Sequence, residues 1–145
     1  MYGQYSETGG FRRTKSDMVA HLPCGYRDAR KAGHNRLIWT DAEGGRHYRL
    51  HRTDVVSVSP DGWTMTLADG GYATMTTRRA MAQGMAALVP AAAGKYWGVY
   101  GNKGRDSHRP HFLHASDPRA GGAFSSGAAF DLSDGYPVLL TQGDA

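Results

Sequence analysis

The sequence lacks the features on which several classes of protein depend. Its only cysteine, Cys24, excludes an internal disulfide framework and a cysteine-based zinc cluster. No apolar run approaches the roughly 20 residues that span a bilayer, and the N-terminus has no apolar signal core. Neither GxxxxGK(S/T) nor GxGxxG occurs, so the common phosphate-binding loops are absent. We therefore expect a cytoplasmic protein, and the sequence indicates no cofactor.

The positive charge is distributed unevenly. The 145 residues carry a formal net charge of +4, and residues 1–52 hold ten Lys and Arg against five Asp and Glu. The composition, 40% apolar and 21% charged, is typical of one globular domain. A basic half attracts polyanions such as nucleic acid. A solvated basic surface that keeps the protein soluble is the alternative.

The N-terminal third has little periodicity. Residues 1–13 are expected to be a loose arm. A short helix is predicted in 14–23, with Thr14 or Ser16 as its N-cap and Pro23 as its stop. Residues 24–35 then read as a basic connector, with one further helical turn across 26–32 as an option.

From Arg36 onward the apolar residues recur with a period of two, which predicts strands. The turns are expected at 41–45 and at the Pro-Asp-Gly of 60–62. In the last strand Trp63, Met65 and Leu67 should face inward. The predicted strands are 36–40, 46–52, 54–59 and 63–67.

The segment 70–79 changes character halfway. A three-residue loop at 69–71 would pair Leu67 with Ala73 and Met65 with Met75, which keeps the apolar residues on one face. A helix capped by Thr76 or Thr77 should follow and end before Pro90. Its apolar face is Met81, Met85, Leu88 and Val89, and its first turn holds Arg78 and Arg79.

Gly84 lies inside this predicted helix. By helix propensity it weakens the helix by about 1 kcal/mol relative to alanine.

The C-terminal third reads as further β-structure. Strands are expected at 95–101 and 111–115, with a strand pair in 130–140 around Asp134-Gly135. The Gly/Ala/Ser-rich 116–129 should be an insertion or flexible loop.

Together these elements predict an α+β fold, an antiparallel β-meander with one packed helix and an additional C-terminal β element. We expect one domain with three parts: an N-terminal arm and short helix (1–26), a core of β-meander plus helix (27–90), and a C-terminal β extension (91–145).

The order of motifs in 27–82 resembles a family of small proteins of tailed phages and mobile elements. Its pattern is a basic RKxxNNTYL box, then VRLHxTDVV, a PDG turn and LNSGGWRTVTTKDRIN. Here His34 replaces an Asn, Tyr72 replaces the Trp, and Arg78-Arg79-Ala80 replaces the Lys-Asp-Arg run. The resemblance implies a phage accessory protein in the host cell, and no particular activity. The matching residues are Arg30-Lys31, His34-Asn35, Leu50-His51, 53–56, 60–62, Gly70-Gly71 and 74–77.

Three residue groups could carry chemistry. His108, His111 and His114 would ligate a metal if they shared a helical face, but the nearby prolines favour neutral loop histidines. A His/Asp pair from His47, His51 and Asp54 could act as a general base in phosphodiester cleavage, or simply form a hydrogen-bonded sheet face. Cys24 has basic neighbours but no assignable His partner.

A basic sheet face is the remaining candidate site, because guanidinium groups, hydroxyls and an aromatic ring suit phosphates and splayed bases. An ordinary solvated sheet face is the alternative. The predicted anion-binding residues are Arg30, Lys31, Arg36, His47, Arg49, His51, Arg52, Tyr72, Arg78 and Arg79.

The leading hypothesis is a non-enzymatic accessory protein that binds nucleic acid or a host nucleoprotein complex. The second is an anti-defence protein that inhibits a host immune complex of the CRISPR type or sequesters a signalling nucleotide. The third is a weak nuclease.

Overall fold

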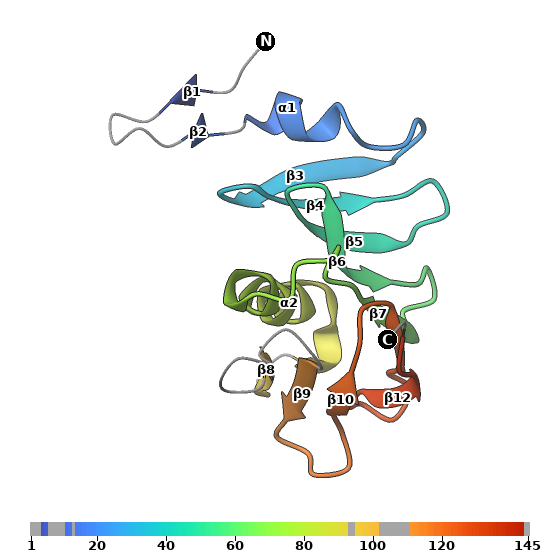
Figure 1. Ribbon diagram of the computed structural model, residues 1–145. Coiled ribbons are helices and arrows are strands. Elements are labelled where there is room, and N and C mark those ends of the chain that lie inside the picture. The colour runs from blue at the N-terminus through green and yellow to red at the C-terminus, as the bar shows by residue number, and fades with distance from the viewer. Residues whose placement is uncertain (1–3, 6–10, 13, 93–94, 102–110, 144–145) are drawn as a thin grey trace.

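The protein is built around an antiparallel seven-stranded sheet in the order β12-β11-β7-β6-β5-β4-β3 (Figure 1). A computed structural model describes residues 4–5, 11–12, 14–92, 95–101 and 111–143. The fold is α+β, as predicted. The strands are β3 (Asp28–Gly33), β4 (Arg36–Thr40), β5 (Arg46–Leu50), β6 (Thr53–Val58), β7 (Thr64–Leu67), β11 (Ala128–Asp131) and β12 (Val138–Thr141).

The strands from β4 to β7 confirm the period of two in the sequence. Each pairs with its neighbour along the chain, and the predicted turns at 41–45 and 60–62 connect them. Met65 and Leu67 are fully buried on the inner face. Trp63, however, precedes β7 and is 56% exposed, so the prediction that it faces inward is wrong.

Residues 28–33 form the edge strand β3, which corrects the prediction of a connector or helical turn. Ala29 pairs with Trp39 and Lys31 with Leu37, so the edge of β4 is not left open. The sequence DARKAG has no β-branched or aromatic residue, so its strand propensity is low. Pairing with β4 overrides that propensity.

The predicted hairpin between 63–67 and 71–76 does not form. Instead β7 pairs with β11, which places Ala128 opposite Leu67 and Phe130 opposite Met65. After β7 the chain leaves the sheet through Gly70 and Gly71, whose φ angles are 63° and 89°. The apolar partners expected from the next segment therefore come from about 60 residues downstream.

Helix α2 (Met75–Leu88) covers one face of the sheet. It begins two or three residues earlier than predicted, because the Thr74 side chain accepts a hydrogen bond from the Thr77 amide and so caps the helix in place of Thr76 or Thr77. Its predicted apolar face is confirmed. The buried residues of that face are Met81, Met85, Leu88 and the C-capping Val89.

At Gly84, α2 lies close against strands β5 and β6. A Cβ added there would lie 2.7 Å from Val56 Cγ2 and 2.9 Å from Tyr48 Cβ. At the end of the helix, Arg46 Nη2 donates a 2.6 Å hydrogen bond to the Leu88 carbonyl oxygen. A cation here satisfies an orphan carbonyl and interacts favourably with the helix dipole.

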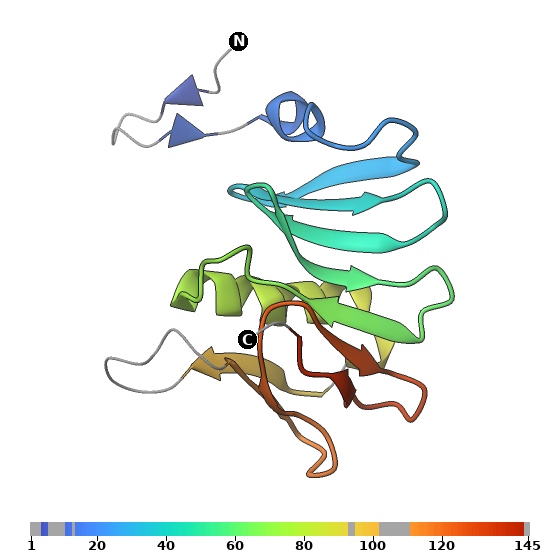
Figure 2. The ribbon, with the colours of Figure 1, turned by 45° about the vertical axis from the view of Figure 1, so that its right-hand side comes forward.

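The short helix α1 (Lys15–Val19) covers part of the opposite face (Figure 2). Its predicted N-cap Thr14 is confirmed, and Asp17 completes a capping box. Met18 packs against Ala29, Leu37 and Trp39 in a second, smaller core. Preceding α1, the two-residue strands β1 (Gln4–Tyr5) and β2 (Phe11–Arg12) pair with each other within the segment predicted to be a loose arm.

A separate three-stranded sheet follows α2, after the 3-10 turn η1 (Pro90–Ala92). It consists of β8 (Trp97–Gly101), β9 (His111–Ala115) and β10 (Gly122–Phe124). Strands β8, β9, β11 and β12 confirm the predicted C-terminal strands, but β10 and the start of β11 lie in the segment predicted to be a flexible loop. Among the described residues, no helix has the length and apolar character needed to cross a membrane.

Candidate functional site

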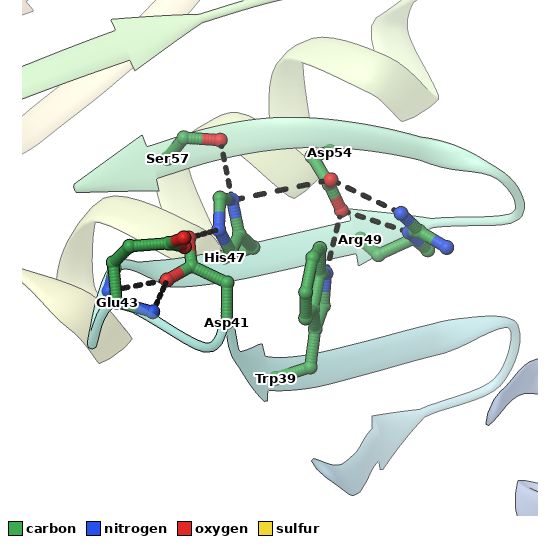
Figure 3. Close-up of polar contacts among 8 residues, drawn as sticks. Trp39, Asp41, Glu43, His47, Arg49, Asp54 and Ser57 are labelled. Carbon is green, nitrogen blue, oxygen red and sulfur yellow. Dashed lines mark hydrogen bonds and ion pairs between the residues drawn. The ribbon is translucent and has the colours of Figure 1, made fainter. Parts of the chain in front are cut away.

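A network of polar side chains lies on the sheet face opposite α2 (Figure 3). The strand register creates it, because Trp39, His47 and Ser57 are direct neighbours across β4, β5 and β6. The Trp39 and His47 rings are stacked, with centroids 4.2 Å apart and planes at 19°. We call the set Trp39, Asp41, His47, Arg49, Asp54 and Ser57 the polar cluster.

Asp54 is the acceptor that organises one half of the polar cluster. It accepts 2.8 Å hydrogen bonds from Trp39 Nε1 and Arg49 Nε, and a 3.1 Å bond from Arg49 Nη2. A β-bulge between Tyr48 and Arg49 sets Arg49 opposite Asp54. Arg49 is only 8% exposed and is held by this carboxylate. The prediction that it lies on an anion-binding surface is therefore wrong.

His47 connects the other half. Its Nε2 lies 2.8 Å from Asp41 Oδ2 and its Nδ1 lies 2.8 Å from Ser57 Oγ. Since a carboxylate only accepts, Nε2 is the donor to Asp41, and Nδ1 pairs with the Ser57 hydroxyl, which can both donate and accept. The hydrogen bond from His47 and those from the Gly45 and Glu43 amides lower the pKa of Asp41 despite some burial.

The polar cluster satisfies its own donors and acceptors. Carboxylate, imidazole and hydroxyl follow in the order found in a general-base system. The two ring nitrogens of His47 are engaged by Asp41 and Ser57 in this order, whereas Asp54 is neutralised by Arg49. His51 lies apart in the β5–β6 turn with φ 55°. The structure brings His47 Nδ1 within 3.9 Å of Asp54 Oδ2 but leaves His51 apart from both. Because Asp54 is also paired with Arg49, we assign the cluster a structural role that joins β4, β5 and β6.

Arg78 belongs to a second polar network, which lies inside the protein. It is 6% exposed, and its Nε donates a 2.9 Å hydrogen bond to His111 Nδ1. His111 Nε2 in turn lies 2.8 Å from Asp69 Oδ2. Gly101 leaves the space that the Arg78 guanidinium occupies. The prediction that Arg78 faces a solvent anion is wrong, because the side chain is buried against His111, which is itself paired with Asp69.

A pocket of about 570 Å³ opens at the N-terminal end of α2. Its wall includes His51 and Arg52 of the β5–β6 turn and the 69% exposed ring of Tyr72. Three predicted site residues that are up to 21 positions apart thus meet in one depression. The remaining lining residues are Leu50, Thr53, Val55, Asp69, Thr74, Thr76 and Thr77.

Further cations lie beside this pocket. The His51 amide donates to the Asn35 carbonyl at 2.9 Å, so the β3–β4 and β5–β6 turns are adjacent. Arg52 Nη2 is 3.1 Å from His21 Nε2. We call this region the basic end of the sheet and define it by Arg30, Lys31, His34, Arg36 and Arg52.

The cations of the basic end differ in exposure. Arg30 and Lys31 are exposed on the edge strand, whereas Arg36 is half-buried. Of the residues described, no carboxylate forms an ion pair with Arg30, Lys31 or Arg52. Arg79 is also exposed, but it lies on the first turns of α2 and contacts Met75.

The metal hypothesis cannot be followed to all three histidines, since His108 lies outside the described residues. His111 is buried on the inner face of β9, where it bonds Asp69 and Arg78. His114 is exposed on the outer face of the same strand. Within the part of the chain that the structure describes, no group of three metal-ligating side chains occurs. Cys24 is exposed.

Several important residues could not be identified from the sequence. The sequence pattern places Trp39 and Ser57 only in strands, and it offers His111 as a metal ligand or a neutral histidine but not as the partner of Arg78. One signal was available: the 41–45 turn together with the period of two places Trp39 opposite His47. No family model, no curated protein and no solved structure matches this chain.

Proposed function

We propose that the protein binds nucleic acid, alone or within a nucleoprotein complex, through the basic end of the sheet. In this proposal it is a non-enzymatic accessory protein of a phage or mobile element. The observation that carries the proposal is that the β3–β4 and β5–β6 turns are joined by a hydrogen bond, so that the end of β3 with Arg30 and Lys31 neighbours the turn with Arg52. Among the described residues, no carboxylate forms an ion pair with these three cations. Unpaired cations of this kind attract phosphates and release counterions on binding.

The neighbouring pocket supports the same proposal. Threonine hydroxyls donate hydrogen bonds to phosphate oxygens, and an exposed tyrosine ring stacks on a base. Thr53, Thr76 and Tyr72 supply both kinds of group beside Arg52. A backbone held by the cations would thus have a base within reach of the pocket.

Fluorescence anisotropy with labelled single- and double-stranded DNA and RNA tests the proposal, at about 50 and 200 mM salt. We expect binding that weakens steeply with salt. Neutralising Arg30 and Lys31 together, as Arg30→Gln and Lys31→Gln, should reduce the slope of log K against log salt by about 2. Arg119→Gln removes one positive charge, half of this change, at an exposed site between β9 and β10 and should leave the slope nearly unchanged, whereas each single variant, Arg30→Gln or Lys31→Gln, should lower it by about 1.

Two results would contradict this proposal. The first is an absence of binding at the lower salt concentration. The second is an equal loss in the Arg119→Gln control and the double variant, which would mean that net charge rather than the basic end is responsible.

The volume of the pocket favours a second candidate function, the sequestration of a signalling nucleotide as an anti-defence protein. A depression of about 570 Å³ has the size of a small-ligand site. Calorimetry with mono- and cyclic nucleotides would show saturable binding that depends only weakly on salt. Arg52→Gln and Tyr72→Ala should each weaken it, while Lys31→Gln should not.

A further inference from the structure

The outer face of the three-stranded sheet carries a group of aromatic side chains. Tyr96, just before β8, is 65% exposed and Tyr100 is 52% exposed. Phe112 and His114 on β9 lie beside them. The centroid distances are 5.9 Å for Tyr100–Phe112, 5.6 Å for Tyr96–His114 and 6.3 Å for Tyr100–His114. We call these four rings the aromatic platform.

The alternation of the two strands accounts for this face. Trp97, Leu113 and Ala115 point inward and are buried in the main core. The rings therefore occupy the outward positions by the geometry of the strands. A core role does not explain the two tyrosines, since more than half of each side chain remains in water.

Gly98 keeps the platform open. It lies between Tyr96 and Tyr100 on the outward side of β8, opposite His114. A Cβ at this position would collide with the phenol end of Tyr96. The Tyr96 ring therefore lies across the strand over the glycine. Glycine in a strand interior weakens the strand, which makes a reason of this kind necessary.

The chemistry of the platform selects among ligands. Its outward positions hold rings and a glycine, with no aliphatic side chain of the type that an apolar helix would need. Neither β8 nor β9 contains an Asp or Glu, and the exposed cation Lys95 precedes Tyr96. Within strands β8 and β9, no carboxylate thus lies beside the rings to repel a phosphate backbone, and the rings can stack on planar groups.

We propose that the aromatic platform binds the unpaired bases of single-stranded nucleic acid by stacking on Tyr96 and Tyr100. The inference rests on the proposed function, since it assumes a nucleic-acid ligand. It adds a second binding surface, and it adds a preference for single-stranded over double-stranded nucleic acid that the basic end does not provide. Stacking on rings tolerates any base, so the platform should distinguish single from double strands rather than one sequence from another.

The test compares three oligonucleotides of about 20 nucleotides: a single strand, the same strand as a duplex, and an abasic strand with the same number of phosphates. The protein carries Tyr96→Ala, Tyr100→Ala or both. Each single substitution should weaken single-strand binding by about tenfold, with duplex and abasic binding changed less than twofold. Trp63→Ala removes a similarly exposed ring from the β6–β7 turn and serves as the matched control.

The fold of each variant is checked by its near-ultraviolet circular dichroism and its urea midpoint. Tyr96→Leu and Tyr100→Leu, which keep apolar bulk but remove the ring, should lose single-strand affinity as the alanine variants do. If the leucine variants bind like the natural protein, stacking is not the interaction and the inference fails. It also fails if the natural protein binds the abasic strand as tightly as the normal strand.

The failure of this inference is distinguishable from the failure of the proposed function. Salt-dependent binding of all three ligands that the tyrosine variants leave unchanged would overturn the platform and retain the basic end. An absence of binding to every ligand at about 50 mM salt would overturn both.

Discussion

Replacing Gly84 with alanine should destabilise the protein, although alanine is the better helix former. Two close contacts determine that the change in the free energy of unfolding is a loss. The added methyl carbon would lie 2.7 Å from Val56 Cγ2 and 2.9 Å from Tyr48 Cβ, whereas ordinary contact begins at 3.4 Å. The second atom is attached directly to the backbone of β5, so a rotamer change cannot move it away. Helix α2 must therefore move outward by about half an ångström along its contact with the sheet.

The magnitude follows from two opposing effects. Overpacking of a core costs typically about 1–3 kcal/mol, and the rigid neighbours here favour the upper half of that range. The gain in helix propensity is about 1 kcal/mol. We therefore expect the free energy of unfolding to fall by about 1–2 kcal/mol, which for a chain of this size lowers Tm by roughly 3–6 °C.

Urea denaturation followed by far-ultraviolet circular dichroism measures this effect as a shift in midpoint at constant slope. Ala87→Gly, at an exposed position of the same helix, reports the propensity effect alone and should cost about 1 kcal/mol. If Gly84→Ala stabilises the protein by about the amount that Ala87→Gly destabilises it, α2 does not approach β5 and β6 as closely as described, and the reasoning is refuted.

Three other predictions test the helix start and the two polar networks. Thr74→Ala should lower the free energy of unfolding by about 1 kcal/mol and Thr76→Ala by less than about 0.5 kcal/mol; equal losses in urea titrations would reject Thr74 as the N-cap. Asp54→Asn should cost about 1–3 kcal/mol, because the partly buried Arg49 loses its charged partner; a double-mutant cycle with Arg49→Met should be strongly non-additive, and additivity would contradict the pairing. Burial raises the pKa of Asp69, but its hydrogen bonds, above all the one from His111, lower the pKa by a larger amount, so the net shift is downward. The stability it contributes is thus present above about pH 4 and is lost as pH falls through its folded pKa. Unfolding at about pH 6 and pH 3 should show the deficit of Asp69→Asn shrinking in acid; a deficit that stays constant would contradict this.

Local patterns in the sequence were sufficient for most of the elements. The period of two between Arg36 and Leu67 predicted β4 to β7, and the spacing of Met81, Met85 and Leu88 predicted the buried face of α2. These predictions succeed because a strand or helix repeats its orientation over a few residues, so the side-chain pattern alone records which face is buried.

Pairing partners depend on the tertiary structure. The pattern of β7 shows that Met65 and Leu67 need apolar neighbours, but β11 meets this need as well as the adjacent segment would. Residues 28–33 became a strand because the edge of β4 was open, against their own propensity.

The tertiary structure also decided which residues of the candidate sites are buried and which are exposed. By residue type Arg49 and Arg78 are surface residues. Arg49 is buried against the carboxylate of Asp54, and Arg78 is buried against His111, which in turn contacts Asp69. Arg30 and Arg52 look no different in sequence, yet they stay exposed at the end of the sheet. The sequence by itself determined how many cations the protein carries. Only the tertiary structure decided which are neutralised, since an ion pair needs two groups within about 4 Å and the chain's path alone brings them there.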